Sequence, residues 1–401
     1  MKPSPKVPQP STINPQPSSL PYREGRGGSS EPLCAIALTQ VKPFHLVGLS
    51  QLYRELGSAT MIVENRHRLK ELVPDIQPRL IDSLRNIDEA MKRAEIELKF
   101  AERYGIQVLT LADPNYPQRL KECDDAPLVL YHKGNADLNA RRIINIVGTR
   151  RCTAYGQDLV RRFIADLRTL CPQVLIVSGL AYGIDICAHR QALANGFDTV
   201  GVLAHGLDDL YPAAHRDTAA QMVHHGGLLT EFPTQTQPIP QNFVQRNRIV
   251  AGMSDACILV ESAAKGGGLI TARIARSYNR EVFAFPGRVG DKASEGCNNL
   301  IRDNGAALIT SATDFIQAIG WNDETLLAHA QQQGIERNLF PQLSSTEQAV
   351  VDVLKNNNDL QINMLSVQSN IPVARLTATL FELEMKGVVK MLAGGVYHLL
   401  M

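Results

Sequence analysis

Four short segments bring glycines, small polar residues and cations to the ends of apolar runs. They are residues 148–150 (Gly-Thr-Arg), 178–185 (Ser-Gly-Leu-Ala-Tyr-Gly-Ile-Asp), 246–248 (Arg-Asn-Arg) and 265–268 (Lys-Gly-Gly-Gly). Glycine lets a phosphate approach the backbone, and the first turn of a following helix offers N–H donors that lack an intrahelical acceptor. Three of the four segments add a cation. The four segments together predict a groove that binds a polyanion.

An alternation of apolar strands and amphipathic helices positions these segments. Strands are predicted at 143–147, 174–177, 199–203, 228–232, 256–260, 281–285 and 307–309, with helices at 156–170, 183–194, 269–278 and 298–304 among those between them. Such alternation predicts a mostly parallel sheet with right-handed crossovers. Because ligands of open α/β sheets bind at the carboxyl ends of the strands, we expect the four segments to share one crevice.

Composition divides the chain into five segments. Residues 1–32 are rich in Pro, Ser and Gln and predict a disordered tail, because they hold too few apolar side chains to offset their ordering entropy. Residues 33–103 predict an N-terminal helical domain of the SAM-like kind, and residues 104–320 the Rossmann-like α/β domain. A polar linker at 321–341 and a winged-helix domain at 342–401 follow.

The last segment combines three predicted helices with a β-hairpin. The helices are predicted at 344–355, 362–369 and 372–386, and the hairpin strands at 388–392 and 396–400. Ser344 precedes the first helix with a Glu three residues later, which is a capping-box pattern. The cations Arg375 and Lys386 of the third helix are offset by Glu382 and Glu384, so that helix lacks the basic stripe that phosphate contacts require. We therefore expect a protein-contact or accessory role for this domain.

The overall composition restricts the class of protein. A net charge of +1 over 401 residues argues against coating a polyanion by bulk charge, so any affinity must come from a local patch. The 7 cysteines include no Cys-x-x-Cys pair, which is typical of a reduced, cytoplasmic protein without a structural metal site. No apolar run approaches the roughly 20 residues that span a membrane. The sequence therefore predicts no membrane partner.

Several of these motifs resemble one protein family. The matching segments are 147–150, 153–156, 178–185, 188–189, 206–208, 211–212, 231–233, 243–252, 269–272, 286–287 and 296–301. In these residues the chain resembles the DNA-processing protein family DprA, also called Smf, of bacterial natural transformation. The resemblance implies a non-enzymatic protein that binds and protects incoming single-stranded DNA. It further implies a homodimer formed through the sheet domain that loads the recombinase RecA during DNA recombination.

If the ligand is a nucleic acid, as the resemblance implies, the candidate binding residues have three roles. The cations neutralise phosphate charge, small residues donate backbone N–H groups, and Tyr182 and Phe243 stack on bases, at roughly 1–3 kcal/mol per base. The complete set is Gly148, Thr149, Arg150, Ser178, Gly179, Tyr182, Phe243, Arg246, Asn247, Arg248, Lys265, Gly266, Gly267 and Gly268. Tyr182 occupies a position that is often basic in the family. The family's N-terminal region often carries a DNA-binding helix–hairpin–helix with closely spaced glycines, whereas residues 41–48 hold only Gly48.

Some of these residues also have a purely structural interpretation. Arg150 would then form a surface ion pair at a strand end, and Lys265 would be a solvated loop lysine. One of Arg246 and Arg248, placed just before a small-residue helix, would pair with Glu231 or Glu261. Both interpretations remain open for these cations at the level of the sequence.

The sequence predicts no catalytic residue, metal or cofactor. Asp185 and His189 lie one helical turn apart, as a metal-binding pair would, but no third ligand accompanies them, so we expect structural hydrogen bonds. Ser178 lies outside a Gly-x-Ser-x-Gly elbow, and Lys265 precedes its glycines instead of following them as in a phosphate-binding loop.

A nucleotide phosphoribohydrolase of the lysine-decarboxylase-like Rossmann family is the alternative function. Those enzymes resemble this chain in the glycines at a helix start after a strand. Their signature places Thr after the glycines and a catalytic Glu three residues later. In this chain Thr271 is followed at that distance by Ile274. The missing carboxylate ranks this function second.

Overall fold

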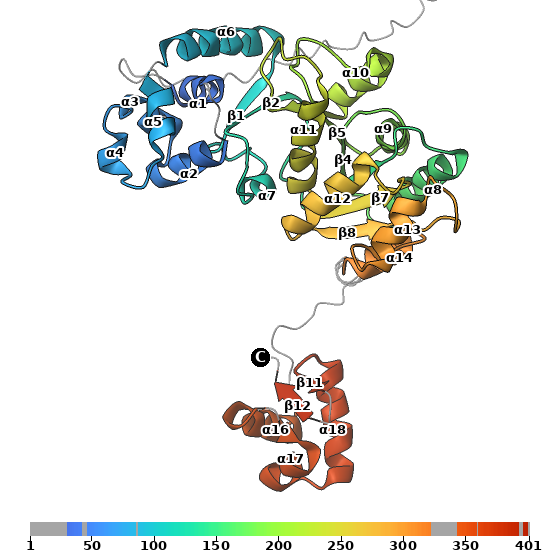
Figure 1. Ribbon diagram of the computed structural model, residues 1–401. Helices are drawn as coiled ribbons and strands as arrows, with labels where there is room; N and C mark the ends of the chain where they lie inside the picture. The colour runs from blue at the N-terminus through green and yellow to red at the C-terminus, as the bar shows by residue number, and fades with distance from the viewer. Residues whose placement is uncertain are drawn as a thin grey trace, which may run out of the picture. The chain divides into compact units, whose positions relative to one another are not determined.

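The computed structural model describes residues 30–41, 46–85, 87–321, 343–358, 360–392 and 396–399. The chain divides into two compact units, the first ending at Trp321 and the second beginning at Asn322 (Figure 1). Most of the expected tail and of the expected linker lies outside the described residues. The tail was predicted to extend too far, because the first described helix, α1, already begins at Glu31.

Within the described residues, six helices form the N-terminal part of the first unit. They are α1 (Glu31–Gln40), α2 (Leu46–Leu56), α3 (Ala59–Glu64), α4 (Leu69–Leu72), α5 (Pro78–Arg85) and α6 (Asp88–Tyr104). Their buried side chains, such as Leu49 and Leu52, belong to one hydrophobic core with Leu109 and Leu130 of the sheet. The helical region therefore packs directly on the sheet (Figure 1).

A nine-stranded sheet, counted within the described residues, forms the centre of this unit. Its strands are β1 (Gln107–Thr110), β2 (Val129–Gly134), β3 (Ile143–Gly148), β4 (Leu175–Ser178), β5 (Thr199–Val202), β6 (Gly226–Thr230), β7 (Ala256–Val260), β8 (Glu281–Ala284) and β9 (Ala307–Leu308). The spatial order is β1-β2-β6-β5-β4-β3-β7-β8-β9. Strands β3 to β9 pair in parallel, as the sequence predicts, while β1 and β2 are antiparallel. The sequence pattern did not predict β2.

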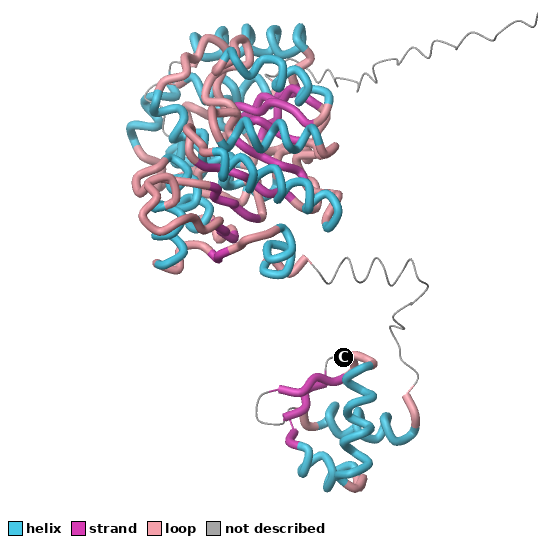
Figure 2. Tube along the Cα trace, turned by 90° about the vertical axis from the view of Figure 1, so that its right-hand side faces the viewer, coloured by secondary structure: helices cyan, strands magenta, loops and turns pink. Residues whose placement is uncertain are grey.

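Helices cover both faces of the sheet (Figure 2). They are α7 (Gln118–Lys121), α8 (Ala154–Leu170), α9 (Ile184–Ala194), α10 (Arg216–His224), α11 (Pro240–Gly252), α12 (Gly267–Ser277), α13 (Glu295–Arg302) and α14 (Ala312–Ala318). Side chains alternate across β3, so Ile146 packs in a core with α8, α9 and α14, whereas Val147 packs in the core that α11 and α12 share. The chain runs outward from β3 to β6 and then returns to place β7 on the other side of β3. The carboxyl end of β3 is therefore the topological switch point, where open α/β sheets bind ligands.

The second unit confirms the predicted winged helix. It contains α16 (Ser345–Asn356), β10 (Leu360–Gln361), α17 (Ile362–Ser369), α18 (Val373–Met385), β11 (Val389–Leu392) and β12 (Val396–Leu399). The capping box forms as predicted, since the Ser344 hydroxyl accepts the N–H of Glu347 and the Glu347 carboxylate accepts the N–H of Ser344. Leu354, Leu376 and their neighbours form a separate hydrophobic core. The turn between the two predicted hairpin strands, residues 393–395, lies outside the described residues.

Within the described part of the chain, no helix combines the length and the apolar character that crossing a membrane requires.

Candidate functional site

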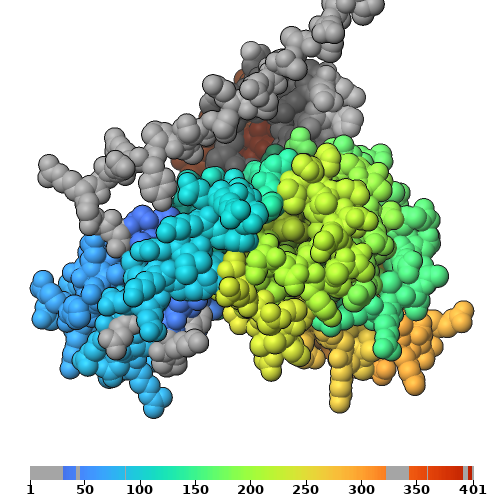
Figure 3. Space-filling view, turned by 90° about the horizontal axis from the view of Figure 1, so that it is seen from above, coloured from blue at the N-terminus to red at the C-terminus, as the bar shows by residue number. Residues whose placement is uncertain are grey.

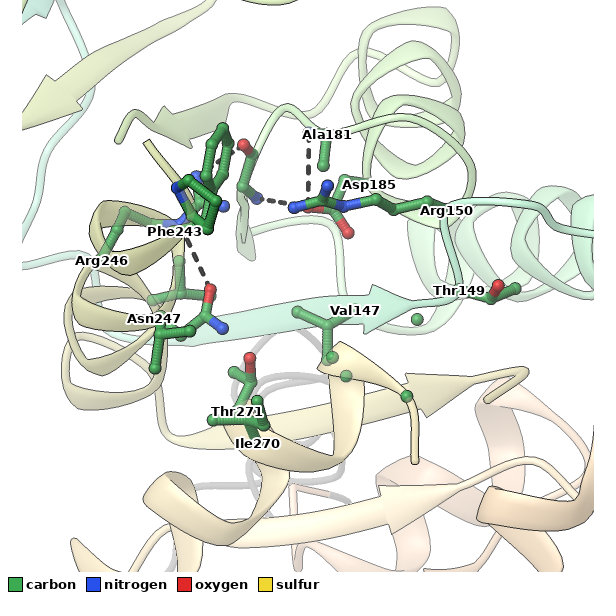
Figure 4. Close-up of a pocket in the computed structure, with 18 of the residues that line it drawn as sticks. Val147, Thr149, Arg150, Ala181, Asp185, Phe243, Arg246, Asn247, Ile270 and Thr271 are labelled. Carbon is green, nitrogen blue, oxygen red and sulfur yellow. Dashed lines mark hydrogen bonds between the residues drawn. The ribbon is translucent and has the colours of Figure 1, made fainter. Parts of the chain in front are cut away.

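A cavity of about 460 Å³ opens at the carboxyl ends of β3 and β4, between α11 and α12 (Figure 4). Its lining includes ten residues of the predicted binding set, namely Gly148, Thr149, Arg150, Gly179, Phe243, Arg246, Asn247, Gly266, Gly267 and Gly268. Arg150 enters from the loop after β3, and Phe243 and Arg246 enter from α11 (Figure 4). The expected convergence of strand ends on one crevice is therefore present.

Arg150 is the cation that the site leaves available. Its side chain is exposed, and its guanidinium lies 5.0 Å from the ring centre of Phe243 in a cation–π contact. Among the described residues it makes no ion pair or hydrogen bond, so the surface ion pair expected under the structural interpretation is not formed. A guanidinium held over an aromatic ring keeps its N–H donors for a ligand.

Arg246 also lines the cavity, but its Nε and Nη1 donors already bind Asn247 and two backbone carbonyl oxygens. It lies on α11 with 3% of its surface exposed. Its Nη1 donates to the carbonyl oxygen of Gly179 at 2.6 Å and to that of Val202. Burial lowers the pKa of the guanidinium to about 10, against the opposing charge of Asp185. Arg246 therefore stays protonated at neutral pH and adds positive potential to the cavity wall while it ties α11 to β4 and β5.

Arg248 does not reach the cavity. Both arginines lie within α11 rather than before it, and side chains two residues apart on a helix point in different directions. Arg248 is 6% exposed. It forms an ion pair with Glu231 and donates to the carbonyl oxygen of Asp125 at 2.7 Å. The structural ion pair with Glu231 is thus the arrangement that the structure contains, and phosphate neutralisation by Arg248 is not supported.

Some of the predicted backbone N–H donors already form hydrogen bonds within the protein, whereas others have no intrahelical acceptor and can bind a ligand. Thr149 donates its N–H to the carbonyl oxygen of Glu261, Gly179 donates to Asp185 and Gly266 donates to Ala263, as the distances of 2.9, 3.1 and 2.9 Å show. The expectation that these three N–H groups hold phosphate oxygens is therefore not supported. Gly267 and Gly268 open α12, where a helix leaves its N–H groups without an intrahelical acceptor. The anion-binding donors of the cavity are concentrated at this helix start.

Three further members of the set lie outside the cavity lining. Ser178 is fully buried and donates its hydroxyl to the carbonyl oxygen of Ile146 at 2.6 Å, so it holds β4 against β3. Lys265 is exposed on the loop before α12 but does not line the cavity. Tyr182 lines a small pocket next to the cavity that also contains Arg150 and Phe243. This residue is 47% exposed, and its ring meets that of His215 edge to face at 4.9 Å.

Tyr211 is an aromatic residue of the site that the sequence analysis missed. It lines both the cavity and the adjoining pocket and is 44% exposed. Its ring meets that of Phe243 edge to face at 5.9 Å. No strand end or glycine segment marks this residue, and it comes to the site because the loop after β5 folds toward α11. Tyr182, Tyr211 and Phe243 therefore surround Arg150 with aromatic surface.

Asp185 and His189 have separate structural roles. The Asp185 carboxylate accepts the N–H groups of Gly179 and Ala181 at 3.1 and 3.4 Å, and burial raises its pKa. His189 is fully buried with its Nδ1 2.7 Å from the hydroxyl oxygen of Thr199. Both side chains therefore make the structural hydrogen bonds that the sequence predicts. Across the residues described, no three His, Cys, Asp or Glu side chains are grouped as a metal site would need.

Comparisons with known proteins agree with this architecture. The sequence profile described as DNA recombination-mediator protein A matches residues 107–320, and that of the DprA winged helix domain matches residues 339–395. The putative DNA processing protein DprA of Mycobacterium tuberculosis is 36% identical over 309 residues, which cover 74% of this chain and 78% of that protein. Protein Smf of Escherichia coli is 31% identical over 312 residues, covering 77% and 81%. The X-ray structure of DNA processing protein A from Streptococcus pneumoniae matches 68% of this chain and 95% of its own, with 33% identity and a TM-score of 0.54.

Proposed function

This chain belongs to the DprA family, and on that premise we propose that it binds single-stranded DNA in the cavity at the carboxyl ends of β3 and β4. The observation that carries the proposal is Arg150, an exposed cation without an ion pair among the described residues, held over Phe243. Gly267 and Gly268 supply helix N-terminal donors on another wall of the same cavity. A phosphate bridges these two groups, and Tyr182, Phe243 and Tyr211 stack on the neighbouring bases.

The proposed protein is a binding protein and not an enzyme. It protects incoming DNA in the cytoplasm during natural transformation and recombination, acts as a homodimer formed through the sheet domain, and loads RecA onto the strand, as its family resemblance implies. The alternative phosphoribohydrolase function has little support at this site. The side chain three residues after Thr271 is Ile274, and it packs against the hydrophobic core instead of presenting a carboxylate.

Single strands are expected to bind far more tightly than duplex DNA and without sequence preference. The reason is that the site combines a phosphate-binding cavity with exposed aromatic rings, which stack only on unpaired bases. The logarithm of the association constant should fall by about 0.7 for each phosphate neutralised per tenfold rise in salt. Fluorescence anisotropy with labelled single-stranded and duplex oligonucleotides at several salt concentrations measures both effects. Equal affinity for the two forms, or a flat salt response, contradicts the proposed site.

The winged-helix unit is expected to contribute little of the single-strand affinity. Its third helix, α18, carries Arg375 against the exposed Glu382 and Glu384. A protein truncated after Asn322 should remain folded, because the two units have separate hydrophobic cores. Its affinity should stay within about tenfold of the full chain, a difference of roughly 1.4 kcal/mol. Gel-shift titrations of both proteins at one salt concentration test this, and a larger loss would assign DNA binding to the second unit.

A further inference from the structure

One buried residue, Glu261, holds both ends of the loop that carries Arg150. Glu261 directly follows β7 and is 3% exposed. Its backbone carbonyl oxygen accepts the N–H of Thr149 at 2.9 Å, which fixes the start of the loop. Its side-chain carboxylate accepts the N–H of Thr153 at 2.8 Å and also the Thr153 hydroxyl, which fixes the end. Only residues 150, 151 and 152 lie between these two anchor points.

Two glycines allow close packing around Glu261 and the Arg150 loop. Gly156, in the first turn of α8, has a glycine-sized gap, since a Cβ there would overlap the Glu261 carboxylate. Gly183, with a φ of 81°, lets the backbone of Thr149 and Arg150 pack directly against the start of α9. The carboxylate also lies at the N-terminus of α8, where the helix dipole favours a negative charge. Glu261 itself adopts a φ of 53°, a left-handed conformation that is uncommon for a residue other than glycine.

We propose that Glu261 is a positioning residue for single-stranded DNA binding, which acts by holding the Arg150 loop in its binding conformation. This inference rests on the proposed function of the cavity. The anchors at Thr149 and Thr153 leave the Arg150 backbone little freedom, so its guanidinium stays over Phe243 without a hydrogen bond of its own. Pre-organisation of this kind removes an ordering cost that DNA binding would otherwise carry. Without the carboxylate, the loop samples other conformations and the cation leaves the cavity.

Glu261→Gln and Thr153→Val test the contact between the Glu261 carboxylate and Thr153 from its two sides. Glutamine removes the negative charge at nearly constant volume. Valine replaces the hydroxyl of the exposed Thr153 by a methyl group; that hydroxyl donates to Glu261 and also accepts the N–H of Gly156 as the cap of α8. Each should weaken single-strand binding by about tenfold, the scale of one hydrogen bond to a charged group. Thr153→Ser keeps the hydroxyl and should restore wild-type affinity. In an Arg150→Ala background, Glu261→Gln should change the affinity less than about twofold, because the residue acts through Arg150.

Glu97 offers a matched control for the loss of a buried carboxylate. It is 1% exposed and accepts both the N–H and the hydroxyl of Thr234, as Glu261 does with Thr153. These bonds join α6 to the segment after β6, and the two segments lie side by side (Figure 3). Glu97→Gln should destabilise the fold as Glu261→Gln does, yet keep single-strand affinity within about twofold. An equal loss of affinity in both variants would mean that Glu261 has only a general structural role.

Hydrogen exchange of the unliganded protein gives a readout that is independent of DNA. The amide hydrogens of Thr149 and Thr153 both donate to Glu261. In Glu261→Gln the peptide spanning residues 149–153 should exchange at least several-fold faster, while the region around Thr234 is unchanged. The positioning role is wrong if Glu261→Gln leaves both the exchange of this peptide and the DNA affinity at their wild-type values. It is also wrong if Glu261→Gln lowers the affinity by the same factor in the wild-type and in the Arg150→Ala background. Wild-type binding by Arg150→Ala alone instead overturns the proposed site, and the positioning role with it.

Discussion

Arg248→Ala should lower the free energy of unfolding of the first unit by about 3–5 kcal/mol, because it leaves the buried carboxylate of Glu231 without its partner. Both side chains of the ion pair are almost fully buried, at 7% and 8% exposure. The change also removes the hydrogen bond to the carbonyl oxygen of Asp125, which joins α11 to the loop before β2. The expected defect is therefore in stability and not in contact with DNA.

The single tryptophan of the chain makes the measurement specific to the first unit. Trp321 packs edge to face on Phe315 at 5.4 Å, so its fluorescence reports the unfolding of that unit in a denaturant titration. The control is the double variant Arg248→Met with Glu231→Gln, which removes both charges and should recover a large part of the loss. Under conditions where the titration shows that Arg248→Ala is folded, its affinity for single-stranded DNA should be close to that of the wild type. A fully stable Arg248→Ala protein with weak DNA binding would return this residue to the binding set.

Arg150→Ala should show the opposite behaviour. Its affinity for single-stranded DNA should fall by about 10- to 150-fold, which corresponds to the roughly 1.5–3 kcal/mol of a hydrogen bond to a charged group. Its stability should be nearly unchanged, because the side chain is exposed and has no ion pair among the described residues. Anisotropy titrations and the Trp321 denaturation curve measure the two quantities on the same samples.

Two further variants separate charge from geometry at this position. Arg150→Lys keeps the charge but loses the planar group that lies over Phe243, and it should recover only part of the affinity. Lys265→Ala removes a cation that is exposed outside the cavity lining and should have a smaller effect. An Arg150→Ala protein that is folded and binds like wild type would exclude Arg150 from the site.

Local patterns in the sequence were sufficient to predict the elements that build the cavity. The apolar runs that end at Gly148 and Ser178 became β3 and β4, and the alternation with helices implied their parallel pairing. The predicted winged helix formed with its capping box at Ser344. Such features depend on neighbouring residues, whose periodicity and cap chemistry are visible in a short window. The convergence of Gly148, Gly179 and Gly266 on one cavity was also predictable, because the carboxyl ends of parallel strands lie at the same edge of a sheet.

The partner of each polar group was decided only by the tertiary structure. Arg246 and Arg248 look alike in the sequence, yet one lines the cavity and the other is paired with Glu231, because they lie on different faces of α11. The N–H groups of Thr149 and Gly179 seemed available until the fold brought Glu261 and Asp185 to them. Tyr211 belongs to a segment that matches the family, but only the fold of its loop shows that it lies in the site. Glycine and charge patterns thus locate a phosphate-binding edge, but hydrogen bonds between distant segments determine which donors remain for a ligand.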